Sequence, residues 1–178
     1  LFVGNFVAGT RPVSDQRLDG RVVLTGANTY TGATTVRSGI LEIATAGAPT
    51  TTSISLDAPG TLVATGAYAG IPARIASNKL ATASAGSLAL SGDTADTITL
   101  GLYPTLMIGA VAPSALNTLS ASFTPGTQGY RFGGGGSTLT VNTVLTGANA
   151  LNVGAAGSLG TVVLAGFNDY TGATTVNA

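Results

Sequence analysis

The sequence predicts an all-β fold in which the chain winds forward as a parallel β-solenoid. One observation behind this prediction is a series of short strand-like runs, each bounded by Gly, Asn, Asp or Pro. Within these runs apolar and polar or β-branched residues alternate, as in Leu139, Thr140 and Val141, which is the period of a pleated strand. In chain order the expected strands lie in RVVLTG from Arg21, GILEIA from Gly39, TSISLDA from Thr52, GTLVATG from Gly60, GSLALSG from Gly86, DTITLG from Asp96, STLTVN from Ser137, TVLTGAN from Thr143 and GTVVLAG from Gly160.

The second observation is the spacing of related stretches, which distinguishes a solenoid from a sandwich. LTGAN at Leu145 and LAGFN at Leu164 lie about 19 residues apart, and GTL at Gly60 and GSL at Gly86 lie about 26 residues apart. Repeats of this length are typical of one coil of a solenoid, which buries its inward face only by stacking on neighbouring coils. Dividing the 178 residues by about 21 predicts about eight coils of 19 to 26 residues.

Three segments depart from the strand pattern. Residues 71–86 (IPARIASNKLATASAG) and 112–123 (APSALNTLSASF) have Pro near the start and apolar residues at loosely helical spacing. Each is therefore expected to form a short helix or a loop that projects from a coil. The run GGGGS at residues 133–137 lies between strand-like residues, and we interpret it as a native tight turn.

One turn is almost duplicated: NTYTGATTV from Asn28 returns as NDYTGATTV from Asn168. Its glycines can adopt positive φ at a corner, its Asn can bond its own backbone, and its Tyr can cover the coil below. At a period of about 19 residues, Asn149 and Asn168 could stack and pair their amides in a ladder, or they could simply form turns. The expected turn and stacking residues are Gly26, Asn28, Tyr30, Gly32, Asn149, Gly166, Asn168, Tyr170 and Gly172.

The composition excludes several classes of function. Only 8% of the residues are charged, and seven basic and seven acidic residues are scattered singly, so no basic stripe exists for nucleic acid. His and Cys are absent, which excludes Ser-His-Asp catalysis, Cys nucleophiles and the common metal triads. No apolar run approaches the roughly 20 residues of a transmembrane helix. We expect no cofactor and no enzymatic activity.

Asp93 and Asp96 are the exception that the sequence leaves open. They lie close together in SGDTADTITLG, in an expected turn. Asp is an ordinary turn former, which is the interpretation we favour. The alternative is a carbohydrate-binding or polysaccharide-cleaving β-helix, in which the two carboxylates hold Ca²⁺ or act as an acid and base pair.

The stretch LTGANTYTGATTVRSGILEI, residues 24–43, resembles the autotransporter-associated β-strand repeat of large bacterial surface proteins, and LAGFNDYTGATTVNA from Leu164 resembles it again. The resemblance implies a right-handed parallel β-helix, exported to the surface or surroundings of a bacterium with two membranes. We therefore expect residues 1–178 to form a single β-solenoid segment of a longer chain or fibre, with a structural role as a stalk or adhesin shaft. The expected partners are further copies, by end-to-end or lateral stacking, and surface or matrix glycans.

Overall fold

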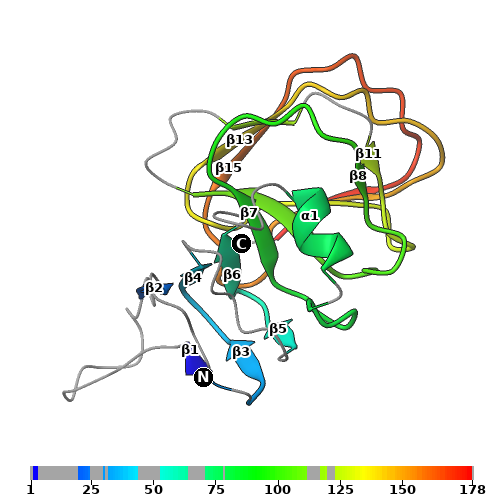
Figure 1. Ribbon diagram of the computed structural model, residues 1–178. Helices are drawn as coiled ribbons and strands as arrows, with labels where there is room; N and C mark the ends of the chain where they lie inside the picture. Colours follow the sequence, from blue (N-terminus) through cyan, green and yellow to red (C-terminus); the bar gives the residue numbers. More distant parts are fainter. Residues whose placement is uncertain are drawn as a thin grey trace.

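The computed structural model describes residues 2–3, 20–24, 30, 32–43, 53–63, 71–77, 79–111, 117–119 and 123–177, and these form a parallel β-solenoid (Figure 1). An eight-stranded sheet runs through the whole stack, and every strand in it is parallel to its neighbours. From one edge to the other its strands are β2 (Arg21–Leu24), β4 (Ile40–Ile43), β6 (Thr61–Val63), β7 (Ser87–Leu90), β9 (Met107–Ala110), β12 (Tyr130–Phe132), β14 (Leu151–Val153) and β16 (Thr174–Val176).

Smaller parallel sheets form the other faces of the solenoid. They contain β1 (Phe2–Val3), β3 (Thr34–Val36) and β5 (Ile54–Leu56); β10 (Asn117–Leu119), β13 (Thr138–Val141) and β15 (Thr161–Leu164); and β8 (Ile98–Thr99) with β11 (Phe123–Thr124). Each turn of the chain adds one strand to the large sheet, and six of these turns carry at least one further strand among the described residues.

The register of the large sheet confirms the predicted period. Arg21 pairs with Ile40, about 19 residues further along the chain, and Thr61 pairs with Ser87, about 26 residues further along. The other steps of the large sheet lie between these two limits. The number of coils is lower than the expected eight. The large sheet has eight strands, but only six turns carry a further strand among the described residues: the turn after β6 holds a helix, and β16 belongs to the last described turn.

The core is a column of side chains that stack from coil to coil. Leu41, Leu62, Leu88, Ile108 and Phe132 occupy paired positions in successive strands, and all are fully buried. Burial of each is worth about 1.5 to 3 kcal/mol, and each depends on the coils above and below it. Phe123 packs its ring on Phe132, with centroids 5.3 Å apart, and closes the column from another face.

The two segments that the sequence predicted to be a short helix or a loop differ in the structure. Residues 71–76 form the six-residue helix α1 (Ile71–Ala76), and the rest of that segment returns to the stack, where Ala85 N donates to Leu56 O at 2.8 Å. In the other segment, residues 112–116 and 120–122 lie outside the described residues, but 117–119 form strand β10 rather than a helix. Pairing with β13 satisfies the backbone there and overrides the weak helical spacing.

The glycine run does more than turn the chain. Gly133, Gly134, Gly135 and Gly136 all have positive φ, at 131°, 90°, 83° and 83°. This glycine strap (residues 133–136) lies against the outward face of the large sheet, where Ser87 Oγ donates to Gly133 O at 2.9 Å. A Cβ on Gly134 would collide with Ser87 Oγ.

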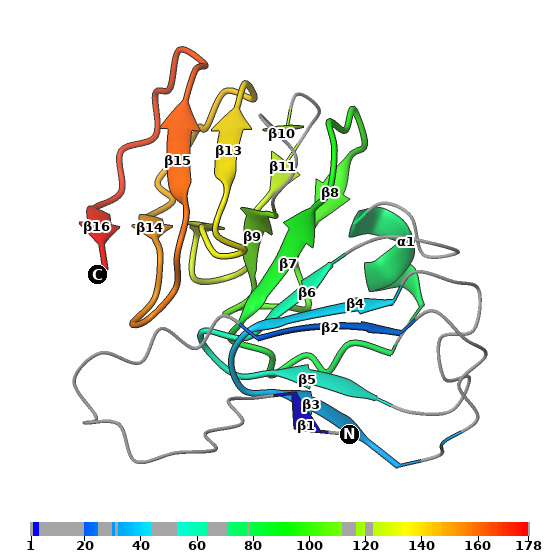
Figure 2. The ribbon, with the colours of Figure 1, turned by 90° about the vertical axis from the view of Figure 1, so that its left-hand side faces the viewer.

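The strap explains why the outward face of the large sheet is buried in the middle of the stack. Both faces of β7 and β9 are buried, including Ser87, Ala89 and Met107 on the outward side. The loop between β14 and β15 adds to the cover, since Gly157 lies near Pro59. Figure 2 shows how the strand direction turns progressively from β2 to β9, which brings these distant coils together.

We expect Gly134→Ala to lower the free energy of unfolding by about 2 to 4 kcal/mol, because it combines a left-handed backbone with a collision at Ser87. Gly136→Ala is the matched control: its φ is also positive, but no heavy atom lies within 4 Å of an added Cβ, so it should cost only about 1 kcal/mol. Urea unfolding followed by circular dichroism measures both. Equal losses would show that the strap does not pack on the sheet.

Candidate functional site

The duplicated turn forms the same internal hydrogen bond in both copies. The hydroxyl groups of Tyr30 and Thr34 lie 2.8 Å apart, and those of Tyr170 and Thr174 also lie 2.8 Å apart. Each bond joins the corner to the first residue of the strand that follows, β3 or β16. The sequence predicted Tyr30 and Tyr170 as turn residues and Thr34 and Thr174 as β-branched residues of the strands, but not the bonds between them. The shared Tyr-x-x-x-Thr spacing was the signal that could have identified them.

In the second copy, the turn is bound to the coil below it. Asn168 Oδ1 accepts a hydrogen bond from Leu145 N at 2.8 Å, and Asn168 Nδ2 donates to Gly166 O at 2.9 Å. The amides of Asp169 and Tyr170 both donate to Leu145 O, at 3.0 and 3.1 Å. Asn168 therefore satisfies a backbone donor of the preceding coil and fixes its own turn, as expected of a turn residue.

Of the two alternatives left open for Asn149 and Asn168, turn formation is the one observed and the amide ladder is wrong. Asn149 Nδ2 donates to Thr146 O at 3.1 Å, within its own turn, while both polar atoms of Asn168 bond to backbone groups. The cause is the length of this coil, since Leu151 pairs with Thr174, about 23 residues further along the chain, and the motif spacing is shorter. Asn168 consequently lies over Leu145, and Gly172 lies over Asn149.

Gly166 and Gly172 do not have the positive φ expected of the turn glycines, and the glycines differ in what surrounds them. A Cβ on Gly172 would collide with Asn149 O, and one on Gly166 would lie 2.9 Å from Asn142 O, so both positions require the close approach of two backbones. Gly32 is exposed, with no described atom near an added Cβ. Gly26 and Asn28 lie outside the described residues.

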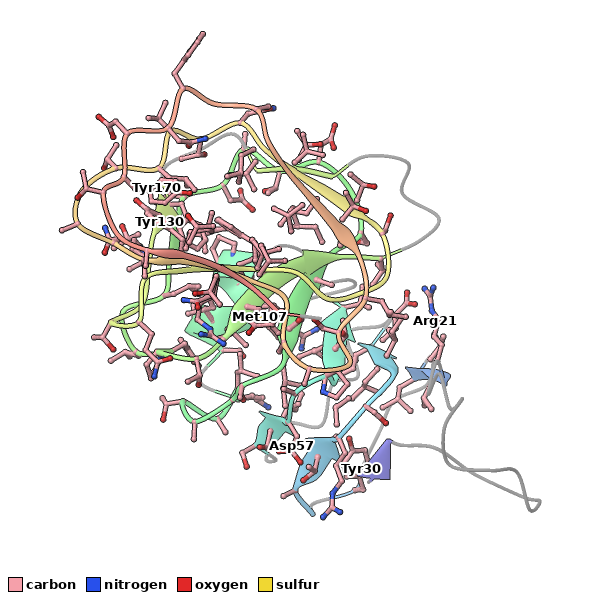
Figure 3. All side chains as sticks on the ribbon, turned by 180° about the vertical axis from the view of Figure 1, so that it is seen from behind. Arg21, Tyr30, Asp57, Met107, Tyr130 and Tyr170 are labelled. Carbon is pink, nitrogen blue, oxygen red and sulfur yellow. The ribbon has the colours of Figure 1, made fainter. Side chains whose placement is uncertain are left out.

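The aromatic part of the turn is tied into the core. The ring of Tyr170 meets that of Tyr130 edge-on, with centroids 6.4 Å apart, and Figure 3 shows the two side chains together. Tyr130 OH donates to Thr146 O at 3.2 Å, and Thr146 N lies 3.0 Å from the same hydroxyl. Tyr170 thus covers the coil beneath it, as the sequence predicted.

The two copies occupy different faces of the solenoid. In the first, β2 lies in the eight-stranded sheet and β3 in the sheet of β1 and β5. In the second, β15 lies in the sheet of β10 and β13, and β16 lies in the eight-stranded sheet. The motif therefore determines a corner and its two flanking strands, but not which sheet those strands join.

Asp93 and Asp96 lie in the exposed turn between β7 and β8. Asp96 N donates to Thr94 Oγ1 at 3.2 Å, a bond typical of a polar turn. In the described part of the chain, no three His, Cys, Asp or Glu side chains come together as metal ligands. The alternative role of the two carboxylates in binding glycan or Ca²⁺ stays a prediction.

Two titratable groups outside the turn have shifted pKa values, and both shifts come from burial. Burial raises the pKa of Tyr103, whose hydroxyl donates to Leu80 O at 3.4 Å. Burial lowers the pKa of Arg131, whose Nε donates to Thr105 O at 3.0 Å. Both side chains bond to carbonyl groups of the preceding coil, so their polar atoms serve coil stacking.

Asn168→Ala should lower the free energy of unfolding by about 1 to 3 kcal/mol, because it leaves the Leu145 amide without its acceptor. Asn149→Ala should cost less, about 0.5 to 1 kcal/mol, since its bond to Thr146 is exposed. The losses should add within about 0.5 kcal/mol in the double variant, because the two amides do not bond each other. Chemical unfolding of the parent chain, the two single variants and the double variant measures these free energies. A strong coupling between the two substitutions would show that the two amides do interact, as in the ladder.

Among the residues described, no helix is long and apolar enough to cross a membrane. No curated protein and no solved structure matches the chain. The family model of the passenger-associated-transport-repeat matches residues 19–43 and 156–178, the segments that contain the two copies of the turn. The chain therefore contains two segments that match the passenger-associated-transport-repeat, set in a parallel β-solenoid.

Proposed function

We propose that this chain is a non-catalytic structural segment of an autotransporter-like passenger, a β-solenoid stalk or adhesin shaft at the surface or in the surroundings of a bacterium with two membranes. The two passenger repeats and the solenoid fold support the class.

The observation that carries the structural role is the use of the polar groups that recur in the repeat. Asn168 bonds to the Leu145 amide and its own turn, and Tyr170 bonds to Thr174 and packs on Tyr130. A binding or catalytic site needs polar groups directed toward a ligand. Here the polar groups of the repeat bond to other groups of the protein itself. Their role is therefore to hold one coil on the next.

The stack also has the mechanical character of a shaft. The strands pair in parallel in every sheet that the described residues form, and the buried column of Leu41, Leu62, Leu88, Ile108 and Phe132 passes through successive coils. Since each coil is held by its neighbours, the length of the rod is set by the number of coils. Such a rod can hold other parts of a passenger away from the membrane.

A second candidate function is glycan binding through Asp93 and Asp96. The observation that favours it is that both carboxylates are exposed in one turn, next to the hydroxyl of Thr94. In most glycoside hydrolases a pair of carboxyl groups flanks the bond of the bound sugar that is cleaved.

Antibodies raised against the purified chain should label intact cells of the producing bacterium or its culture medium, because a passenger segment is displayed or released. Immunofluorescence with and without permeabilisation measures this, with an antibody against a cytoplasmic protein as the control. Labelling that requires permeabilisation would contradict the proposed location.

The double variant Asp93→Ala/Asp96→Ala should behave as the parent chain on a glycan array and in calcium titration, because a shaft does not use these carboxylates. Asp169→Ala, which removes another exposed carboxylate, is the matched control for loss of charge. The glycan-binding function would be favoured instead if the parent and the control bind a glycan and the double variant binds it at least tenfold more weakly. The circular dichroism spectrum of the double variant must be unchanged for this comparison.

A further inference from the structure

The middle of the large sheet carries a second apolar core, on the face that points away from the main column. Val63, Ala89 and Val111 are buried there, and the partly buried Ile40 packs against them. We name this group of four residues the outer cluster. Val63 directly follows Leu62 of the main column, and successive side chains of a strand point to opposite faces. An apolar cluster on this face stays out of water only where another segment covers it.

The glycine strap reaches this face from a later coil, since it follows β12 in the chain. Its first glycine accepts a hydrogen bond from Ser87 Oγ at 2.9 Å. A Cβ added at Gly134 would lie 3.7 Å from Thr61 Oγ1. A Cβ added at Gly135 would lie 3.2 Å from Val111 Cγ1 of the outer cluster. The strap therefore lies against β6, β7 and the residue that follows β9.

Backbone hydrogen bonds hold the strap in this position from two sides. Ala110 N donates to Gly134 O at 3.1 Å, and Ser137 N donates to Ala110 O at 3.2 Å, so the strap is bonded to the end of β9. Gly136 N donates to Leu159 O at 3.1 Å, in the loop between β14 and β15. The strap therefore cannot leave the outer cluster without breaking bonds to the coil before it and the coil after it.

These contacts join coils that are not neighbours. In a solenoid with contacts only between adjacent coils, each coil can open with little effect on coils further away. Here the order in the large sheet is β6, β7, β9 and β12, and the strap that follows β12 lies against Thr61 of β6. Opening of β6, β7 or β9 uncovers the outer cluster and removes contacts of the strap, so it also destabilises the other two strands.

We propose that the glycine strap locks β6, β7 and β9 into one unit that opens as a whole, so that the middle of the solenoid does not open one coil at a time. The strap lies between the two segments that match the passenger repeat, so the repeat does not specify it. The lock is a property of this chain, and it goes beyond the proposed structural role because it concerns how the solenoid opens.

Native-state hydrogen exchange followed by mass spectrometry measures the opening of each strand separately. Gly134→Ala should speed exchange of the backbone amides of β6, β7 and β9 by a common factor of at least about thirtyfold, because the added Cβ forces the strap off Ser87. The decisive strand is β6, which does not pair with β12. Gly136→Ala is the matched control and should speed exchange by about fivefold at most, since its Cβ meets no described atom.

Two further variants complete the test. Ser87→Ala removes only the hydroxyl that donates to the strap, and it should speed exchange of the same three strands by about two- to tenfold. It decides the test if circular dichroism shows that Gly134→Ala does not fold. Asn168→Ala removes a bond of the last described coil, away from the strap, and should leave exchange of β6 and β7 within about twofold of the parent.

Two results would overturn the proposal. If the variants at Gly134 and Ser87 speed exchange only in β9 and β12 and leave β6 at the parent rate, each coil depends on its neighbours alone. If Asn168→Ala speeds exchange of β6 as much as that of its own coil, the whole solenoid opens together and the strap holds no separate unit. Neither result changes the surface labelling expected of a passenger segment, so failure of the lock is distinguishable from failure of the proposed function.

Discussion

The structure depends on the parallel pairing of each coil with the next. One coil places only a few apolar side chains inward, and the cost of ordering its backbone, about 1 to 2 kcal/mol per residue, exceeds what those side chains return alone. The free energy becomes favourable when coils stack, because Leu62 then lies between Leu41 and Leu88 and the backbone of its strand is hydrogen-bonded to a strand on each side. Fold, stability and the shape of the molecule therefore follow from one repeated contact.

The polar side chains serve the same contact. Asn168 holds the amide of Leu145, Tyr103 holds the carbonyl of Leu80, and Arg131 holds that of Thr105, and each bond joins one coil to the preceding one. The glycine strap adds a link of a different kind, because Ser87 and Gly133 belong to coils that are not adjacent in the large sheet. A sequence poor in charge can therefore still form specific polar bonds between its coils.

The sequence predicted those features that local periodicity determines and missed those that depend on coil length. Alternation in TLTV and ILEI located the strands, and the recurrence of short motifs gave the range of coil lengths that the register confirms. The Asn149 ladder failed because the motif spacing is shorter than the local coil, in which Leu151 pairs with Thr174. The strap was interpreted only as a turn, since nothing in GGGGS indicates that Ser87 lies against it.

The variable coil length has a consequence for how such a rod can be decorated. The step from Thr61 to Ser87 is the longest in the large sheet, and it accommodates α1 while the strands on either side stay paired in register. Because equivalent strands of the two repeats join different sheets, a feature carried at a corner can point in a different direction on each level. A solenoid built this way can accommodate insertions at its corners and present them around its circumference without interrupting its axis.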